Sequence, residues 1–340
     1  MTAFSDRLLD WWADAGRHDL PWQIDRSPYR VWVSEIMLQQ TQVATVIGYF
    51  DQFMARFPTL QDLAQAPIDD VLALWSGLGY YARARNLHNT ACVCVTKHQG
   101  QLPSDPEALE QLPGIGRSTA NAIVAQAHNR RAVILDGNVK RVLTRHQGID
   151  GWPGQASIEK KLWRLADALT PDQRARDYTQ AIMDLGATVC TRRHPQCDRC
   201  PVAGDCQARL QGKTHQWPTP RPKIDKRVIE MTLAIGLSRK KHILLEKRPD
   251  RGIWGGLWCL PEAHSVPELL KGRPGPAVEP IRHELTHRRV LMAFQSAWVE
   301  SVSRGAHATN QRWFALAKAR TLGLPRPIQR VLKALDGLES

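Results

Sequence analysis

The sequence predicts a protein of two domains, with helices in the first part of the chain and an α+β module in the second. The 340 residues are enough for about two domains of ordinary size. Between Arg209 and Arg227 the chain reads QGKTHQWPTPRPKIDK, and this content of Pro, Lys and Arg indicates an extended linker. We therefore expect a first domain over residues 1–209, a linker over 210–227 and a second domain over 228–340.

The net charge of the chain favours a polyanionic partner. Lys and Arg number 46 against 33 Asp and Glu, which gives a formal charge of +13 and a pI near 9.7. No apolar run reaches the ~18 residues of a membrane span. The N-terminal residues MTAFSDRLLDWW lack the basic and then apolar order of a signal peptide. We expect an intracellular protein that does not bind membranes.

The first element to be expected is one long helix over Pro28–Phe57, with a proline at its start and another after its end. It is apolar around most of its circumference, which is typical of a buried helix. One polar stripe carries Glu35, Gln39 and Gln42. A buried carboxyl has a raised pKa, and an acid that stays protonated near neutral pH suits general acid catalysis. A Glu on a solvated stripe is the alternative.

Residues 112–141, LPGIGRSTANAIVAQAHNRRAVILDGNVKR, predict two helices joined by a tight hairpin. A proline should end the first helix, and Gly114 and Gly116 permit positive φ angles. Arg117 and the residues after it open a second helix, Ser118–His128. The free N–H groups at the start of that helix favour a phosphate, so the hairpin suits a sequence-independent grip on a DNA backbone. An ordinary helical hairpin is the alternative.

Two further features lie close to this hairpin in the chain. Asp136 follows the apolar residues Val133, Ile134 and Leu135, which would hold it in the interior, and a plain capping Asp is the alternative. Upstream, LWSGLGYYARARNLH at residues 74–88 interleaves basic and aromatic side chains. That pattern suits a backbone track with base stacking, while exposed charges beside core tyrosines are the alternative.

Four of the seven cysteines lie in one short segment with the spacing C-x6-C-x2-C-x5-C. An intracellular chain rarely keeps structural disulfides, so metal ligation is the better interpretation. Four thiolates in one compact loop fit an iron–sulfur cluster, and a zinc ion is the alternative. The residues are Cys190, Cys197, Cys200 and Cys206. The other three cysteines lack such spacing, and we expect them to pack in apolar surroundings.

After the linker, alternating apolar residues and turn signals predict strands followed by a helix. The expected strands are Val228–Leu237, His242–Glu246, the segment GIWGGLWCLPE, Val290–Glu300 and Gln311–Phe314, and the expected closing helix is Pro327–Leu335.

Taken together and in this order, several segments closely resemble adenine DNA glycosylases of the MutY type, in the helix-hairpin-helix superfamily with endonuclease III. The segments are PWQIDRSPYRVWVSEIMLQQTQVATVI, LWSGLGYYARARNLH, LPGIGRSTA, ILDGNVKRVL and the cysteine quartet. The resemblance is nearly continuous from about Leu20 to Cys206 and weakens beyond Arg209. It implies an all-α glycosylase domain with one [4Fe-4S] cluster, followed by an α+β Nudix-like domain.

The resemblance also implies roles for the site residues. Glu35 would protonate N7 of a flipped adenine, and Asp136 would stabilise the oxocarbenium-like sugar before water completes the hydrolysis, a logic that parallels glycoside hydrolysis by two carboxylates. Asn138 and Tyr80 would support the pocket. Gln40 and Leu78 would fill the space left by the extruded base. The DNA-binding residues implied in this domain are Gln39, Gln40, Thr41, Leu78, Gly114, Gly116, Arg117, Ser118 and Lys140.

Two positions separate this chain from lyase relatives, whose Schiff-base chemistry needs an amine. Ser118 stands where those enzymes carry a lysine after the hairpin Arg, and Glu35 stands where they carry an apolar residue. Lys140 would form at most a slow Schiff base. A bifunctional glycosylase/lyase acting on oxidised pyrimidines is therefore the second interpretation. A cluster-containing DNA-binding protein without activity is the third, and the presence of both Glu35 and Asp136 argues against it.

The second domain departs from its family in two places. The stretch EAHSVPELLKGRPG lacks the Glu-rich catalytic box, so we expect no pyrophosphohydrolase activity. The family reads 8-oxoguanine through a Phe-Ser-His segment, and Leu285, Thr286 and His287 stand there in this chain. The resemblance thus implies a monofunctional adenine glycosylase for double-stranded DNA with A:8-oxoguanine or A:G mispairs. We expect a cytoplasmic, nucleoid-associated monomer, and the strength of its lesion preference stays open.

Overall fold

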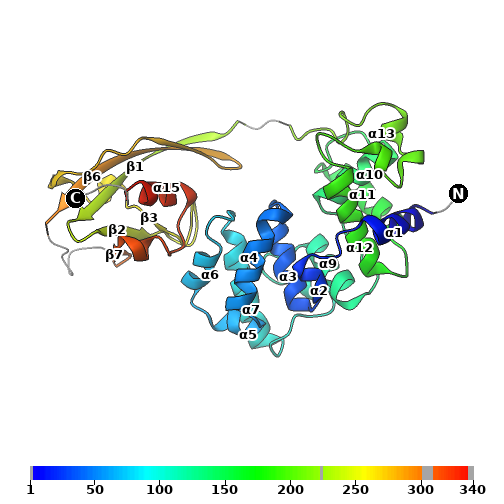
Figure 1. Ribbon diagram of the computed structural model, residues 1–340, viewed down its shortest axis with the longest axis horizontal. Coiled ribbons are helices and arrows are strands. Elements are labelled where there is room, and N and C mark those ends of the chain that lie inside the picture. The colour runs from blue at the N-terminus through cyan, green and yellow to red at the C-terminus, as the bar shows by residue number, and fades with distance from the viewer. Residues whose placement is uncertain (1–2, 223–224, 301–308, 336–340) are drawn as a thin grey trace. The chain divides into compact units, whose positions relative to one another are not determined.

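The computed structural model describes residues 3–222, 225–300 and 309–335, and it divides into two compact units (Figure 1). The first unit comprises Met1–Ala64 and Asn89–Lys223. The second comprises Gln65–His88 and Ile224–Ser340. A stretch from the N-terminal half of the chain therefore belongs to the same unit as the C-terminal module. In the described parts, no helix combines the length and the apolar character that crossing a bilayer requires.

The first unit is helical. Its helices are α1 (Phe4–Ala15), α2 (Pro21–Ile24), α3 (Pro28–Leu38), α4 (Val43–Arg56), α5 (Leu60–Gln65), α7 (Ala82–Lys97), α8 (Pro106–Glu110), α9 (Arg117–His128), α10 (Gly137–Gln147), α11 (Ala156–Leu169), α12 (Ala175–Asp184) and α13 (Gln207–Leu210). Helices α5 and α7 each cross a border between the units. Apolar side chains of α1, α10, α11 and α12 form one buried cluster around Leu8, Leu143, Leu162 and Ile182. This cluster fixes the helix that follows Asp136.

The prediction of one long helix over Pro28–Phe57 is wrong, because the structure has two helices there. Helix α3 ends at Leu38 and α4 begins at Val43. Between them Gln40 takes a φ of 59°, which an α-helix cannot accommodate. The break falls on the polar run QQTQ, which offers no apolar side chain to hold another helical turn in the core. Gln42 becomes the residue before α4 and does not continue the polar stripe of α3.

The predicted hairpin is present, with two corrections. Helix α9 begins at Arg117, one residue earlier than predicted, and ends at His128 as predicted. Gly114 has the expected positive φ of 79°. Gly116 does not: its φ of −97° and ψ of 170° are extended, as is usual for a residue that precedes a helix. A single left-handed residue is therefore enough to reverse the chain at this turn.

The second unit is built around a seven-stranded sheet with the order β3-β2-β1-β6-β4, to which β5 adds on β6 and β7 on β2. The strands are β1 (Arg227–Ser238), β2 (His242–Lys247), β3 (Trp258–Cys259), β4 (Arg273–Pro274), β5 (Ile281–Glu284), β6 (Arg288–Val299) and β7 (Gln311–Ala315). Strands β1 and β6 run parallel over their full length, and the neighbouring pairs are antiparallel. The unit also holds α6 (Ile68–Leu74), α14 (Leu316–Ala319) and α15 (Arg326–Leu335).

The predicted strands and the closing helix correspond to β1, β2, β6, β7 and α15, with ends that shift by up to two residues. The segment GIWGGLWCLPE contributes only the short strand β3. Residues 65–88 pack on the C-terminal module within this unit. The Tyr81 hydroxyl donates to the Leu324 carbonyl at 2.9 Å, and the Arg85 guanidinium donates to the Gly255 carbonyl at 2.5 Å.

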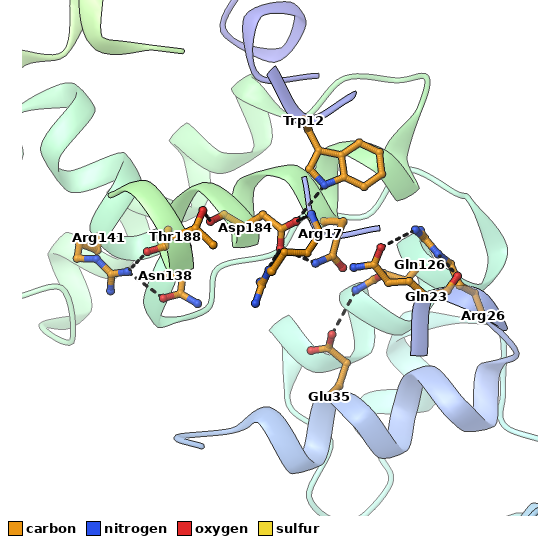
Figure 2. A network of polar contacts seen from close by, with 12 residues as sticks. Trp12, Arg17, Gln23, Arg26, Glu35, Gln126, Asn138, Arg141, Asp184 and Thr188 are labelled. Atoms are coloured by element: carbon orange, nitrogen blue, oxygen red, sulfur yellow. Dashed lines mark hydrogen bonds and ion pairs between the residues drawn. The ribbon is translucent and has the colours of Figure 1, made fainter. Parts of the chain in front are cut away.

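A buried carboxylate at the end of α12 binds residues near the start of the chain (Figure 2). Asp184, the last residue of α12, is 0% exposed. It accepts hydrogen bonds from the Trp12 indole at 3.0 Å and from Nε of Arg17 at 2.9 Å. It also accepts one from the Gln180 amide at 2.8 Å. The chain then winds into a π-helical turn at Leu185–Val189, and the Thr188 hydroxyl donates back to the Asp184 carbonyl at 2.8 Å.

Gly186 in this π-helical turn packs directly against α10. It is buried, and a Cβ atom added to it would lie 2.6 Å from the Asn138 Cβ. We expect Gly186→Ala to destabilise the protein by about 1–3 kcal/mol, since overpacking forces backbone shifts. Gly48→Ala in α4 is the matched control, because a Cβ there meets nothing within 4 Å. It should be neutral or slightly stabilising. Thermal unfolding of both variants measures the difference, and equal midpoints would contradict this packing.

Candidate active site

Glu35 lies on α3 with its carboxyl directed toward α9 (Figure 2). The Gln126 amide donates to Glu35 Oε1 at 3.3 Å. The pKa of Glu35 is raised to about 8. Burial is the largest cause, the charge of Asp136 acts in the same direction, and the Gln126 hydrogen bond acts against both. The prediction of a raised pKa at Glu35 therefore agrees with the structure. A carboxylic acid in this state carries a proton at neutral pH and has one oxygen that is not hydrogen-bonded to Gln126.

Asp136 immediately precedes α10 and caps it. Its Oδ1 accepts the Val139 N–H at 2.7 Å. Burial raises the pKa of Asp136, while the N–H groups of Val139 and Asn138 and the charge of Arg141 act to lower it. The capping role foreseen as an alternative is real, and it coexists with a position at which the Asp136 charge acts on Glu35. The two carboxyl groups therefore lie close enough for the charge of one to act on the other, and they have different hydrogen-bond partners.

Helix α9 holds the segments that carry both carboxyls. The Ser118 hydroxyl accepts the Leu135 N–H at 3.0 Å, next to Asp136. The Asn121 amide donates to the Val133 carbonyl at 2.7 Å. On its other side, α9 meets α3 through Gln39, whose amide donates to the Thr119 hydroxyl at 3.4 Å, and through Gln126. Ser118, predicted to stand in place of a catalytic lysine, therefore supports the backbone that carries Asp136.

Helix α10 connects the site to the cysteine segment. Arg141 donates to the Asn138 side-chain oxygen at 2.9 Å (Figure 2). It also donates to the Gly186 carbonyl at 2.6 Å and to the Cys190 carbonyl at 2.7 Å. One turn later Arg145 is 2% exposed. Its guanidinium donates to the carbonyls of Thr191, Arg192 and Trp217, and to Cys190 Sγ at 3.4 Å. A buried cation therefore organises the start of the cysteine loop.

The four predicted ligand thiols line one cavity together with the Arg145 side chain. They are free cysteines, as are the other three in the chain. Burial raises the pKa of Cys200 to about 12, and burial and the charge of Cys190 raise the pKa of Cys197. A cationic centre is what keeps such crowded thiols ionised, so the donor set fits an iron–sulfur cluster. Within the described residues, no three His, Cys, Asp or Glu side chains are gathered into a site for a single ion.

The other predicted residues of the first unit lie on its surface or near it. Gly114, Gly116, Arg117 and Gln40 are exposed, and the Arg117 guanidinium lies over the Trp163 ring at 4.0 Å from its centroid. Lys140 is occupied by an ion pair with Glu159 at 2.5 Å. Thr41 lies in the break between α3 and α4, where its hydroxyl donates to the Gln39 carbonyl at 3.4 Å.

Five predicted residues belong to the second unit. Leu78 is 7% exposed, so filling a gap in DNA would require it to leave its buried position. Tyr80 is exposed, has a φ of 50°, and shares a hydrogen bond with the Thr286 hydroxyl at 3.4 Å. Thr286 and His287 form an exposed turn between β5 and β6, closed by the Leu285 N–H on the Arg288 carbonyl at 2.8 Å.

Sequence reasoning missed several residues that shape the site: Asn121, Gln126, Arg141, Arg145 and Asp184. A signal was available for Gln126. It follows Thr119 by seven residues, so both lie on the same face of α9, and it interrupts a run of small and apolar residues. The roles of Arg141 and Arg145 depend on carbonyl groups far along the chain, and no local pattern indicates such contacts.

Comparison with known proteins adds an independent line of evidence. The family described as HhH-GPD superfamily base excision DNA repair protein matches residues 33–168. The iron–sulfur binding domain of endonuclease III matches residues 190–206, and the NUDIX domain matches residues 232–334. An adenine DNA glycosylase of Buchnera aphidicola (subspecies Baizongia pistaciae) is 37% identical over 97% of this chain and 95% of its own length. The chain belongs to the adenine DNA glycosylase family.

Other relatives agree with this family assignment. The human adenine DNA glycosylase is 46% identical over 77% of this chain and 57% of its own length. Among solved structures, a thermostable thymine-DNA glycosylase is 29% identical and has a TM-score of 0.55 over 61% of this chain and 95% of its own. An endonuclease III–DNA complex, at 22% identity and a TM-score of 0.53, supports the fold alone. The all-α fold with an iron–sulfur binding segment and a Nudix-type module is therefore confirmed, and family members bind one [4Fe-4S] cluster.

The raised pKa of Glu35 predicts a pH-dependent stability. The folded protein keeps the Glu35 proton up to pH near 8, whereas the unfolded chain loses it near pH 4.5. The free energy of unfolding therefore falls as pH rises from the lower value through the upper one. Glu35→Gln removes this titration. The Tm of the variant minus the Tm of wild type should therefore increase as the pH rises from about 5 to about 9. The same exchange at exposed Glu110 is the control, and a difference in Tm for Glu35→Gln that stays constant with pH would contradict the raised pKa of Glu35.

The cysteine segment predicts a brown protein with about four irons per chain. Cys200→Ser should remove most of the iron and the associated visible absorbance, since one ligand of the cluster is lost. Cys92→Ser, outside the cysteine segment, is the control and should retain both. Iron analysis and absorbance of protein purified without oxygen test this. Stoichiometric zinc in place of iron would contradict the assignment.

Proposed function

We propose that this protein is a monofunctional DNA glycosylase that hydrolyses the N-glycosidic bond of adenine mispaired with 8-oxoguanine or guanine in double-stranded DNA. The observation that carries the proposal is Glu35, a carboxylic acid protonated near neutral pH, beside the second carboxyl of Asp136. Family membership supports the class of reaction. The net charge of +13 supports a DNA substrate.

In this proposal Glu35 is the general acid. Adenine is a poor leaving group as an anion, and protonation of N7 lets it depart as a neutral base. The pKa of Glu35, near 8, keeps its proton available at physiological pH. The base must first leave the helical stack to reach the acid, as in other enzymes that act on bases. The turn residues Gln40 and Leu78 would fill the space that the extruded base leaves in the duplex. Asn138 and Tyr80 would support the pocket that receives the base.

Asp136 is assigned to the sugar. As the glycosidic bond lengthens, positive charge develops on the deoxyribose ring, and a carboxylate within reach of it lowers the barrier. The capping contact with Val139 N–H keeps Asp136 oriented and favours its ionised form. Water then completes the hydrolysis. Ser118 offers no amine for a Schiff base, and Lys140 is held by Glu159, so the lyase reaction of bifunctional relatives is not proposed here.

The remaining parts receive supporting roles. Gly114, Gly116 and Arg117 are assigned to the DNA backbone together with Gln39, Thr41, Ser118 and Lys140. The cysteine quartet would hold the cluster, whose metal–thiolate bonds would stabilise the loop behind α10. We also propose that the chain has three functional segments: a glycosylase domain over 1–209, a linker over 210–227 and a Nudix-like domain over 228–340. The protein is proposed to act as a nucleoid-associated monomer in the cytoplasm.

The proposed chemistry is tested by single-turnover excision on duplexes with A opposite 8-oxoguanine, A opposite G and A opposite T. Wild-type protein should excise adenine from the first two duplexes and not from the third. Glu35→Gln should bind DNA normally and lose about 10²–10⁴-fold in rate, because adenine departs poorly without a proton donor. Asp136→Asn should lose more than about tenfold, roughly 1.4 kcal/mol of barrier. Exposed Glu110→Gln is the control. Retained turnover in Glu35→Gln would place the acid elsewhere.

Lesion reading is assigned to the turn of Leu285, Thr286 and His287. Thr286→Ala should narrow the preference for A:8-oxoguanine over A:G by roughly 0.5–1.5 kcal/mol, the contribution of one neutral hydrogen bond. The control is Thr232→Ala, the same exchange at an exposed position of β1. Excision rates on the two duplexes give the ratio for each variant. An unchanged ratio in Thr286→Ala would remove the turn from the proposal and leave the chemistry of the first unit untouched.

A further inference from the structure

Gln126 is a buried amide with a contact that packing alone does not require. It is 2% exposed and lies on a helix face whose other buried residues include Ala122, Ile123 and Val124. A polar side chain in such a place is costly unless it is hydrogen-bonded. Its Nε2 donates to Glu35 Oε1 at 3.3 Å (Figure 2). The polar contact that offsets the burial of this amide is therefore its hydrogen bond to the carboxyl of Glu35.

The backbone at Gln126 is fixed from the opposite side. Arg176 of α12 donates from Nε to the Gln126 carbonyl at 2.8 Å and from Nη2 to the Ala127 carbonyl at 3.2 Å. The Arg176 N–H in turn donates to the Asn129 side chain at 3.2 Å. The last turn of α9 is thus clamped to α12, and the Gln126 side chain extends from a rigid support toward α3.

The chemistry of an amide N–H restricts what Glu35 does with its proton. An N–H group only donates, so it meets a lone pair of Oε1, and the carbonyl oxygen of a protonated carboxyl is the better acceptor. The acidic proton then belongs on Oε2. Asp136, at the start of α10, is the charged group of the described residues that acts on Glu35, and it opposes ionisation. Gln126 acts in the opposite direction and keeps the acid from becoming too weak.

We propose that Gln126 is a positioning residue that holds the Glu35 carboxyl with Oε1 bound and Oε2 carrying the proton for the departing base. The proposal rests on the proposed function, in which Glu35 is the acid. It assigns to α9 a direct influence on the acid, besides the support that this helix gives to the backbone before Asp136. The pH profile separates this role from a structural one, since loss of packing alone would not move it.

The test is single-turnover adenine excision by Gln126→Met as a function of pH, on duplex with A opposite 8-oxoguanine. Methionine keeps the length of the side chain and removes the donor. Since the lost bond favoured ionised Glu35, the pKa of the acid rises, and the fall in rate at high pH should move upward by about 0.5–1 pH unit. The maximal rate should fall by roughly two- to tenfold, because the carboxyl loses its orientation.

Two further variants keep the test decisive. Gln126→Asn keeps a buried amide that is too short to reach Glu35, so its pH profile should shift as that of Gln126→Met does. Gln180→Met exchanges another buried glutamine, 3% exposed, which serves Asp184 instead. Its profile should not shift, whatever its thermal stability.

The outcomes distinguish the two proposals. An unshifted profile in both Gln126 variants overturns the positioning role, and so does a shift to lower pH, which would mean that the amide oxygen accepts the Glu35 proton. In either case wild-type excision of adenine would leave the proposed function standing. No adenine excision by wild type on any duplex would instead remove the proposed function itself.

Discussion

Helix α9 is the constraint on which the candidate site depends. Its Ser118 and Asn121 side chains bind the backbone just before Asp136, and its Gln126 side chain binds Glu35. The two carboxyls come from segments about a hundred residues apart in the chain, so their relative position is set by what they share. A single rigid helix between them fixes that position within the tolerance that two-carboxylate chemistry demands. The hairpin glycines only have to start this helix at the right place.

The two carboxyls have different hydrogen-bond partners in the same packed interior. Glu35 accepts one hydrogen bond from a neutral amide, and the charge of Asp136 opposes its ionisation. Its pKa is near 8. Burial raises the pKa of Asp136 as well, while backbone N–H groups at a helix start and the nearby charge of Arg141 act to lower it. Burial therefore acts on both groups, and their hydrogen-bond partners differ. The partners of Asp136 stabilise its anionic form, which is the form that the proposed chemistry requires.

Much of this site was accessible from the sequence, and the missing parts have a common physical reason. Glu35, Asp136 and the cysteine quartet were identified by local spacing and family resemblance, because their chemistry depends on residue type. The break at Gln40 was missed because apolar periodicity continues on both sides of it, and only the polar content of four residues indicates it. Gly116 was assigned a left-handed backbone it does not have. Arg145 and Asp184 were missed because their partners are brought together by tertiary packing alone.

The contacts of Arg141 and Arg145 explain why a cysteine loop belongs behind this site. Asn138 and the Cys190 carbonyl bind the same guanidinium, and Gly186 fits against Asn138 without space for a side chain. A loop of short turns with Cys197 and Cys206 offers little apolar surface to hold itself in place. Metal–thiolate bonds supply the missing free energy. The cluster segment thereby completes the wall that α10 packs against, and through α10 it bears on the orientation of Asp136, at whose side chain that helix begins.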